Sequence, residues 1–465
     1  MNMVNFFKQY KFLVISSLVY ALIFSALSLW RHATFQTQTW DLAAFEQSLW
    51  NTLHGHFLFN NFENTSHFAI HFSPWLLLLM PIYALWPGPH ILLLLQSLAL
   101  AAGAWPLYFL SKKIINQKWA NVIVLLYLLY PSLHWVNLFD WHPVTFAIPL
   151  FLAWFYFWQA EKYPWAAAMM AAAVSTEEDM IVAAFFVGLF MLTKKQYRPG
   201  LMVMGLTGAY FLLATKVLMP AFGGGLVRLD RYAQFGGTAS GIAASVILQP
   251  SLTAATLFQW SKLQYIGNLL LPVAFLPLLA PLTLILLIPG LLQNLLTNFS
   301  LQFSNVYQYD SILIPFIFMG VIWAVNWLLT KKMSEKVLLP LVVFCAVTGF
   351  IWYSPLSPKS FPWPKFFNSR TADFNKLVAA IPATASVAAH TNLVPHLTHR
   401  ANIYMAGYEP TLMDYVILDS QDLFGFQTKN DLDSYLDNYA QTGEYDVVVI
   451  DQRYYVIKRK ALPST

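Results

Sequence analysis

The sequence predicts an all-α polytopic membrane protein of about eleven transmembrane helices, followed by a small α/β domain at the C-terminus. Of the 465 residues, 58% are hydrophobic and 11% are charged, whereas soluble domains carry roughly a quarter of charged residues. The apolar residues form continuous runs of about 18 to 22, the length that a helix needs to cross the hydrocarbon layer. From about residue 366 the composition becomes polar, which indicates a separate soluble domain.

The apolar runs favour helices over barrel strands because they do not alternate with polar residues. The first run, 11–30, is too long for a signal peptide and lacks a clear small-residue cleavage site, so we expect it to be retained. The chain has a single cysteine, Cys345, which excludes an intrachain disulfide or a cysteine metal cluster. Further spans are expected near 89–110, 119–136, 143–160, 164–176, 179–193, 201–219, 263–279, 281–297, 311–330 and 337–353.

The positions of the lysines predict the topology. Lys8 and Lys11 precede the first run, which places the N-terminus in the cytoplasm. Two apolar stretches, 71–86 and 89–110, lie before the next lysine, Lys112. If both stretches crossed the membrane, the cluster at Lys112 would fall outside, so we expect 71–86 to lie at the outer interface or to re-enter. The later lysine clusters then become cytoplasmic, and the C-terminal domain of a multi-pass plasma-membrane protein lies outside.

This reasoning divides the chain into three parts. Residues 1–354 form the predicted transmembrane domain, with outer interfacial helices at about 39–54 and 71–86. The proline-rich segment 355–365 is a linker, and 366–465 is the extracytoplasmic α/β domain. Short β-rich runs and one helix-like stretch predict its elements at 386–389, 415–419, 445–450 and 430–439.

The first outer loop carries two acidic residues on different faces of an amphipathic helix. Asp41 shares a face with Phe45 and Ser48, whereas Glu46 falls among leucines, so the two carboxylates do not form one paired site. Asp41 is explained equally well as a residue favoured by the helix dipole at the helix start. An unpaired Glu46 on an apolar face is costly and is therefore a candidate binding residue.

Further acids and histidines gather in the predicted outer loops. His71 opens the interfacial segment, Asp140 and His142 lie in Phe139-Asp-Trp-His-Pro, and three acids follow one another in the turn Glu177, Glu178 and Asp179. Ionisable groups at membrane depth usually pair, bind ions or line a pathway, although a turn that protrudes into water would simply be solvated. A divalent cation is a candidate cofactor, because oxygen and imidazole ligands of this kind are offered by Asp140, His142, Glu178 and Asp179.

The predicted outer loop at 220–262 supplies two guanidinium groups, Arg228 and Arg231. An arginine fork matches phosphate oxygens, so these residues are candidates to bind a lipid phosphate, with ordinary loop charge as an equally good explanation. Tyr309 offers a hydroxyl in another outer loop. The chain has no phosphate-cradling glycine motif of the nucleotide-binding type, and nothing predicts a nucleic-acid partner.

Several long strings resemble a known family. These are Trp40-Asp-Leu-Ala-Ala-Phe-Glu-Gln-Ser-Leu-Trp-Asn-Thr, His71-Phe-Ser-Pro, Gln96, Phe139-Asp-Trp-His-Pro, Glu178-Asp179 and, in the tail, Asn392-Leu-Val-Pro-His-Leu-Thr-His-Arg400 and Asp414-Tyr-Val-Ile-Leu-Asp. They resemble the domain-of-unknown-function 2079 family of polytopic membrane proteins over nearly the whole chain. That family name implies no settled activity.

The predicted architecture is similar in turn to the GT-C glycosyltransferases, which share a first span, an acidic residue on an outer interfacial helix, a second interfacial helix and an extracytoplasmic tail. The resemblance implies that Asp41 acts as the catalytic base and that Tyr309 matches a tyrosine before a late span. This chain lacks the adjacent acidic pair common in the first loop of those enzymes.

The expected function is therefore transfer of a sugar from a polyprenyl-phosphate-linked donor at the outer face. Besides Asp41 and the two arginines, the expected substrate-binding residues are Glu46, His71, Asp140, His142, Glu177, Glu178 and Tyr309. A transporter or flippase is the first alternative, but it predicts inverted repeats and polar residues at mid-membrane, and the predicted spans show few of either. The second alternative is a non-catalytic membrane protein whose tail binds a partner.

Overall fold

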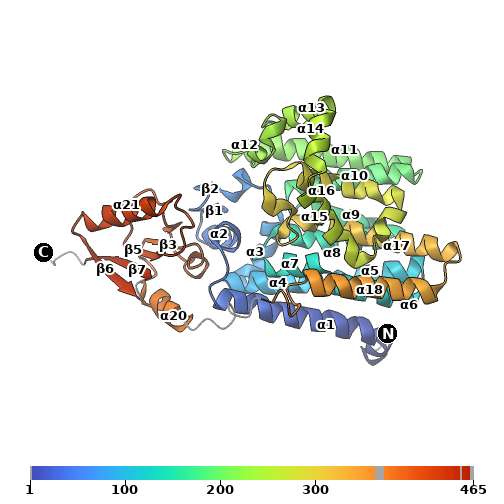
Figure 1. The fold of residues 1–465 in the computed structure, drawn as a ribbon, viewed down its shortest axis with the longest axis horizontal. Helices are drawn as coiled ribbons and strands as arrows, with labels where there is room; N and C mark the ends of the chain where they lie inside the picture. Colours follow the sequence, from blue (N-terminus) through green and yellow to red (C-terminus); the bar gives the residue numbers. More distant parts are fainter. Residues whose placement is uncertain (1–2, 362–370, 451–452, 461–465) are drawn as a thin grey trace.

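The chain forms a helical bundle joined to a smaller sheet domain, and α2 lies between the two (Figure 1). The computed structural model describes residues 3–361, 371–450 and 453–460. Part of the predicted linker at 355–365 therefore lies outside the described residues. The large core of the bundle is built from buried leucine, alanine, phenylalanine and isoleucine side chains of nearly every helix.

The first helix, α1 (Met3–Ala33), runs along one side of the bundle and packs against α4 (Pro89–Ala102) (Figure 1). Arg31 and His32 occupy its last turn, where positive charge complements the partial negative charge of the helix C-terminus. This end of α1 leads into the first loop, which contacts the C-terminal domain.

The first loop contains the two helices that the sequence predicts. The first is a π-helical turn, η1 (Thr39–Ala43), continued by α2 (Ala44–Leu53), and the second is α3 (Trp75–Leu85). Between them lie the hairpin strands β1 (Phe59–Asn60) and β2 (Thr65–Ser66) and the 3-10 turn η2 (His67–Ala69). The 11 residues of α3 extend only about 16 Å, which is short for a helix that crosses a bilayer.

The remaining helices of the bundle follow in sequence order. The first group is α5 (Ala104–Ile114), α6 (Gln117–Leu128), α7 (Pro131–Leu138), η3 (Pro143–Phe146), α8 (Ala147–Gln159), α9 (Tyr163–Val174), α10 (Glu178–Thr193), α11 (Tyr197–Leu213), η4 (Ala214–Leu218) and α12 (Met219–Ala221). The second group is η5 (Leu229–Phe235), α13 (Ala239–Leu248), α14 (Pro250–Leu257), α15 (Trp260–Leu270), η6 (Leu271–Val273), η7 (Leu276–Leu279), η8 (Pro281–Thr283), α16 (Leu284–Leu296), η9 (Ser300–Phe303), η10 (Gln308–Ile312), α17 (Ile314–Thr330) and α18 (Glu335–Tyr353).

Among the described residues, four helices are long and apolar enough to cross a membrane, and two bent pairs raise that number to six. The four are Lys8–Ala33, Pro89–Ile114, Tyr197–Ala221 and Glu335–Tyr353. Five shorter apolar helices of 10–17 residues match other predicted runs, so the predicted count of about eleven spans is not confirmed.

Two segments differ from the sequence prediction. The run 263–279 is not one helix, because α15 ends at Leu270 and two 3-10 turns follow, each with a proline, Pro272 and Pro277, that cannot continue a helical ladder. The predicted loop at 220–262 instead contains α13 and α14, which meet at Pro250 in a bend of 96° between Leu229–Leu248 and Pro250–Leu257.

The C-terminal domain is built on a five-stranded mixed sheet with strand order β4-β3-β5-β7-β6. Its strands are β3 (Val387–Ala389), β4 (Ile403–Met405), β5 (Tyr415–Asp419), β6 (Tyr445–Ile450) and β7 (Tyr454–Arg459), and its helices are α20 (Thr371–Ala380), η11 (Val394–His396) and α21 (Lys429–Ala440). The runs predicted as β3, β5, β6 and α21 are confirmed, whereas β4 and β7 were not predicted. β3 pairs in parallel with both β4 and β5.

The sheet domain docks on the first loop, between α1 and α3, through backbone and side-chain hydrogen bonds. The Thr39 N–H donates to the Thr391 hydroxyl over 3.2 Å, and the Asn392 amide donates to the Thr37 carbonyl over 3.2 Å. Gln47 of α2 donates to the Arg400 carbonyl over 3.3 Å. The docking surface therefore has two sides. One is formed by η1, α2 and the segment between α1 and η1, and the other by the segment between β3 and β4.

Candidate active site

Asp41 and His142 form a direct pair at the start of the first loop. Asp41 Oδ1 lies 2.8 Å from His142 Nε2, although 101 residues separate them in sequence. Gln96 fixes the backbone of His142, because the Gln96 Oε1 accepts the His142 backbone N–H over 3.0 Å. The ring also stacks on Phe139, with centroids 5.5 Å apart. These contacts hold the imidazole against one oxygen of the Asp41 carboxylate.

Asp140 lies beside this pair and is fully buried. Its Oδ2 accepts the Gln38 N–H over 2.7 Å, and its Oδ1 lies 3.7 Å from the Arg31 guanidinium. The backbone of Asp140 has a φ of 42°, a left-handed conformation that few non-glycine residues adopt. Burial raises the pKa of Asp140 to about 7; Arg31 opposes this shift and the nearby charge of Asp41 adds to it.

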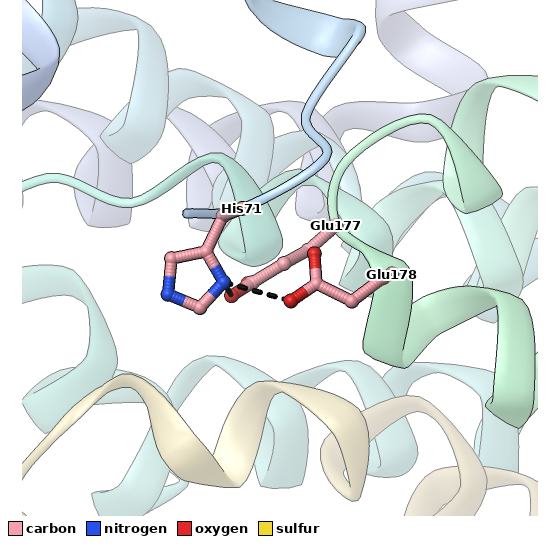
Figure 2. A group of neighbouring side chains, drawn as sticks. All are labelled: His71, Glu177 and Glu178. Carbon is pink, nitrogen blue, oxygen red and sulfur yellow. Dashed lines mark hydrogen bonds and ion pairs between the residues drawn. The ribbon is translucent and has the colours of Figure 1, made fainter. Parts of the chain in front are cut away.

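A second group of ionisable residues joins the loop before α3 to the turn before α10. His71 Nδ1 lies 3.1 Å from Glu177 Oε1 and 2.8 Å from Glu178 Oε1 (Figure 2). The other oxygen of Glu178 accepts the Phe72 N–H over 2.9 Å. Burial lowers the pKa of His71, but the charges of Glu178 and Glu177 outweigh it and raise the pKa to about 10. Burial also raises the pKa of Glu177 to about 8 despite the opposing charge of His71.

Tyr309 and Arg231 connect the two groups. The Arg231 guanidinium donates to the Tyr309 hydroxyl over 3.2 Å and lies 4.1 Å from the centre of the Phe299 ring. Burial raises the pKa of Tyr309, Arg231 lowers it, and the charges of both Asp41 and Glu177 raise it further. Tyr309 therefore lies within electrostatic reach of one carboxylate from each group.

Glu46 lies in a different environment from Asp41. Its side chain is fully buried, and Oε1 accepts the Tyr83 hydroxyl and contacts His399 Nε2, both over 2.6 Å. Glu46, on an apolar face of its helix, thus has one polar partner from α3 and one from the C-terminal domain. The structure places Glu46 at the junction between bundle and sheet domain.

The remaining predicted residues divide between the groups. Asp140 and His142 contact Gln38, Arg31 and Asp41, whereas Glu178 contacts His71 and Asp179 accepts the Gln293 amide over 2.5 Å. The four candidate metal ligands therefore do not share one set of partners. Among the described residues, one trio offers ligand atoms that all lie within 4.8 Å of one another: His71, Glu177 and Glu178. Arg228 is exposed.

Sequence reasoning missed several residues that position the site. Arg31 directly follows the first predicted run, 11–30, and its place in the last turn of α1 is the only local signal of its contact with Asp140. Gln96 belongs to the strings that carry the family resemblance, and the sequence gives no other sign of its role. Its amide donates to the Asp140 backbone carbonyl over 2.8 Å. A buried amide in an apolar helix indicates a hydrogen bond to some polar partner, but it does not indicate which residue that partner is.

The fold resembles solved glycosyltransferases of the GT-C class. ArnT from Cupriavidus metallidurans bound to undecaprenyl phosphate superposes with a TM-score of 0.56 at 10% identity, covering 96% of this chain and 98% of ArnT. Its apo form gives the same TM-score and coverage at 12% identity. The apo oligosaccharyltransferase of Archaeoglobus fulgidus gives 0.43 at 10% identity, covering 96% of this chain and 75% of its own. At these identities the likeness shows the fold alone.

The sequence itself matches one family model. Comparison with curated proteins finds no match. The model described as "Predicted membrane protein (DUF2079)" matches residues 31–456, which is most of the chain and includes both the bundle and the sheet domain. The chain therefore belongs to the DUF2079 family of predicted membrane proteins.

Proposed function

We propose that this protein transfers a sugar from a polyprenyl-phosphate-linked donor to an acceptor hydroxyl at the outer face of the plasma membrane. The hydrogen bond between His142 and Asp41 carries the proposal, because it orients a carboxylate as a general base needs to be oriented. The GT-C-like fold supports it, since the matching ArnT structure has undecaprenyl phosphate bound. The proposed topology keeps the N-terminus cytoplasmic and the sheet domain outside.

In the proposed reaction the acceptor oxygen attacks the anomeric carbon of the donor sugar. The bond between that carbon and the phosphate oxygen breaks, and the polyprenyl phosphate leaves with the bonding electrons. Asp41 takes the hydroxyl proton, and the side chain of His142 holds the carboxylate in place. Arg231, with Arg228 from the same loop, binds the departing phosphate, because a guanidinium fork matches phosphate oxygens.

The group of His71, Glu177 and Glu178 shapes the donor pocket or holds a divalent cation. Two carboxylates and one imidazole nitrogen fit the ligand preferences of manganese or zinc. The ion pairs within the trio also satisfy its charges without a metal. Transfer rates with added manganese and with EDTA distinguish these two roles.

The proposal is tested with full-length protein in proteoliposomes and a panel of undecaprenyl-phosphate-linked hexoses. Asp41→Asn removes the base but keeps the shape of the side chain, so sugar release from the donor is expected to fall about 10²–10⁴-fold. Asp433→Asn is the matched control, because Asp433 lies on the exposed face of α21. Unchanged rates in an active preparation of Asp41→Asn would remove Asp41 from the role of base.

A further inference from the structure

A cavity of about 470 Å³ lies where the end of α1 meets the C-terminal sheet. Its walls come from the segment around Thr34 to Gln38 and from the loops of the sheet domain that contain His390 and Asp422. This volume lies within the range of small-molecule binding sites, about 300–1,000 Å³. The cavity is separate from the group of His71, Glu177 and Glu178.

The floor of the cavity is the carboxyl edge of two parallel strands. His390 directly follows β3, and Asp419 is the last residue of β5. From β3 the chain leads to β4 on one side, whereas from β5 it leads to β6 and β7 on the other side. The cavity therefore lies at the point where the strand order reverses, which is where open α/β sheets bind their ligands.

The charges that line the cavity are matched within the described part of the protein. Arg453 forms a bidentate pair with Asp419, and His390 Nε2 lies 3.2 Å from Asp422 Oδ2. Arg31, the other arginine of the lining, faces Asp140. A phosphate or a metal ion would have to compete with the partner that each of these charged side chains already has. The lining thus favours a ligand without net charge.

The uncharged lining combines amide and hydroxyl groups with aromatic rings. Gln36, Gln38 and Asn392 offer amides, whereas Phe374 and Tyr454 offer ring surfaces whose centroids lie 4.7 Å apart. Amides donate to and accept from neighbouring hydroxyls, whereas the paired carboxylates accept from them, and ring faces pack against apolar C–H surfaces. A sugar is the common ligand that presents both kinds of surface.

We infer that this cavity is a carbohydrate-binding site that takes a neutral mono- or disaccharide unit. The site adjoins the candidate active site, because Gln38 lines the cavity and its N–H donates to Asp140. The inference goes beyond the proposed transfer and does not depend on it, since the cavity can bind a glycan whether or not Asp41 acts as a base.

Saturation-transfer NMR tests the inference on the full-length protein in detergent, with maltose, lactose and the methyl glycosides of glucose, mannose and galactose as probes. At least one probe is expected to bind, and binding is expected to weaken at least tenfold in Gln36→Trp, which fills the cavity, and in Asp422→Ala, which removes a lining carboxylate. Asp433→Ala removes an ion-paired aspartate of α21 outside the cavity and is expected to bind normally. Melting curves check that each variant is folded.

Two results would overturn the inference. One is that none of the probes binds, and the other is that the probes bind equally well to both cavity variants. If inorganic phosphate displaced the sugar at millimolar concentration, the assignment to a neutral ligand would be wrong. Asp41→Asn separates the two proposals, because it is expected to abolish transfer while sugar binding in the cavity persists.

Discussion

The imidazole of His399 and the carboxylate of Glu46 lie 2.6 Å apart, although 353 residues separate them in the chain. His399 belongs to the C-terminal domain and Glu46 to α2, so this pair joins the two parts of the molecule. The same Glu46 oxygen accepts the Tyr83 hydroxyl, whereas Oε2 has no hydrogen-bond partner among the described residues. The stability of this junction therefore depends on two contacts to one oxygen.

Tyr83→Phe is expected to destabilise the protein by about 1.5–3 kcal/mol, because it removes a hydrogen bond to a buried charged group. Tyr83 and Glu46 both have fully buried side chains, so water cannot replace the lost donor without a rearrangement. The free energy of unfolding is measured by titration with denaturing detergent. Tyr163→Phe, which alters an exposed tyrosine, is the control, and equal effects of the two substitutions would contradict this role of Tyr83.

The pair also predicts a dependence of stability on pH. Burial lowers the pKa of His399, but the hydrogen bond and charge of Glu46 outweigh it, so the pKa is raised above the ordinary value of about 6.5. The stabilisation is therefore fully present below about pH 6.5 and is lost as the pH rises through the raised value. The effect is expected to be about 1 kcal/mol or less, because 43% of the His399 side chain is exposed.

Melting temperatures between pH 6 and pH 9 check this dependence. The wild type is expected to lose more stability over this range than His399→Gln, which cannot titrate at that position. Other histidines contribute to both curves and cancel in the comparison. Parallel curves for the two proteins would show that the pair does not titrate in this range.

The sequence predicted the helical class and the positions of most helices because hydrophobic runs are local signals. It could not predict where runs break into short helices, as at Leu270, or how those helices pack. Three of the five strands of the sheet were predicted, whereas β4 and β7 were not.

The residue types of the candidate site could be predicted from the sequence, but the contacts between these residues could not. Acids and histidines within apolar sequence are recognisable because burying an ionisable group is energetically unfavourable. Asp41, His71, Asp140 and Glu178 are residues of this kind. Their partners are more than 100 residues away in the chain, as for His71 with Glu178 and Asp140 with Gln38. A single sequence contains no signal for such pairings, so the position of Glu46 at the domain junction became visible only in the fold.

A close helix crossing gives a prediction about the bundle. Gly188 of α10 and Gly200 at the start of α11 face each other, and a Cβ added to Gly188 would lie 2.9 Å from the Gly200 carbonyl and 2.7 Å from Met204 Cγ. Small residues allow membrane helices to approach in this way. Gly188→Ala is therefore expected to destabilise the protein by about 1–3 kcal/mol through overpacking.

The control for this substitution lies on the same pair of helices. A Cβ added to Gly205 of α11 would meet nothing within 4 Å, so Gly205→Ala is expected to be neutral or slightly stabilising. Detergent-induced unfolding compares the two variants. A loss of stability in Gly205→Ala as large as in Gly188→Ala would mean that the crossing is not the cause.

The environment of Arg231 predicts that a positive charge alone is not sufficient at this position. The guanidinium donates to Gln302 and Tyr309, each over 3.2 Å, while its central carbon lies 4.1 Å from the centre of the Phe299 ring. Two bonds use one terminal nitrogen, and a guanidinium has five donors, so others can reach a phosphate. Arg231→Lys keeps the charge but loses the guanidinium fork. Binding of undecaprenyl phosphate, measured by native mass spectrometry in detergent, is expected to weaken severalfold in this variant. Arg198→Lys, at an exposed position in the first turn of α11, is the control, and equal lipid binding by both variants and the wild type would remove Arg231 from the proposed phosphate site.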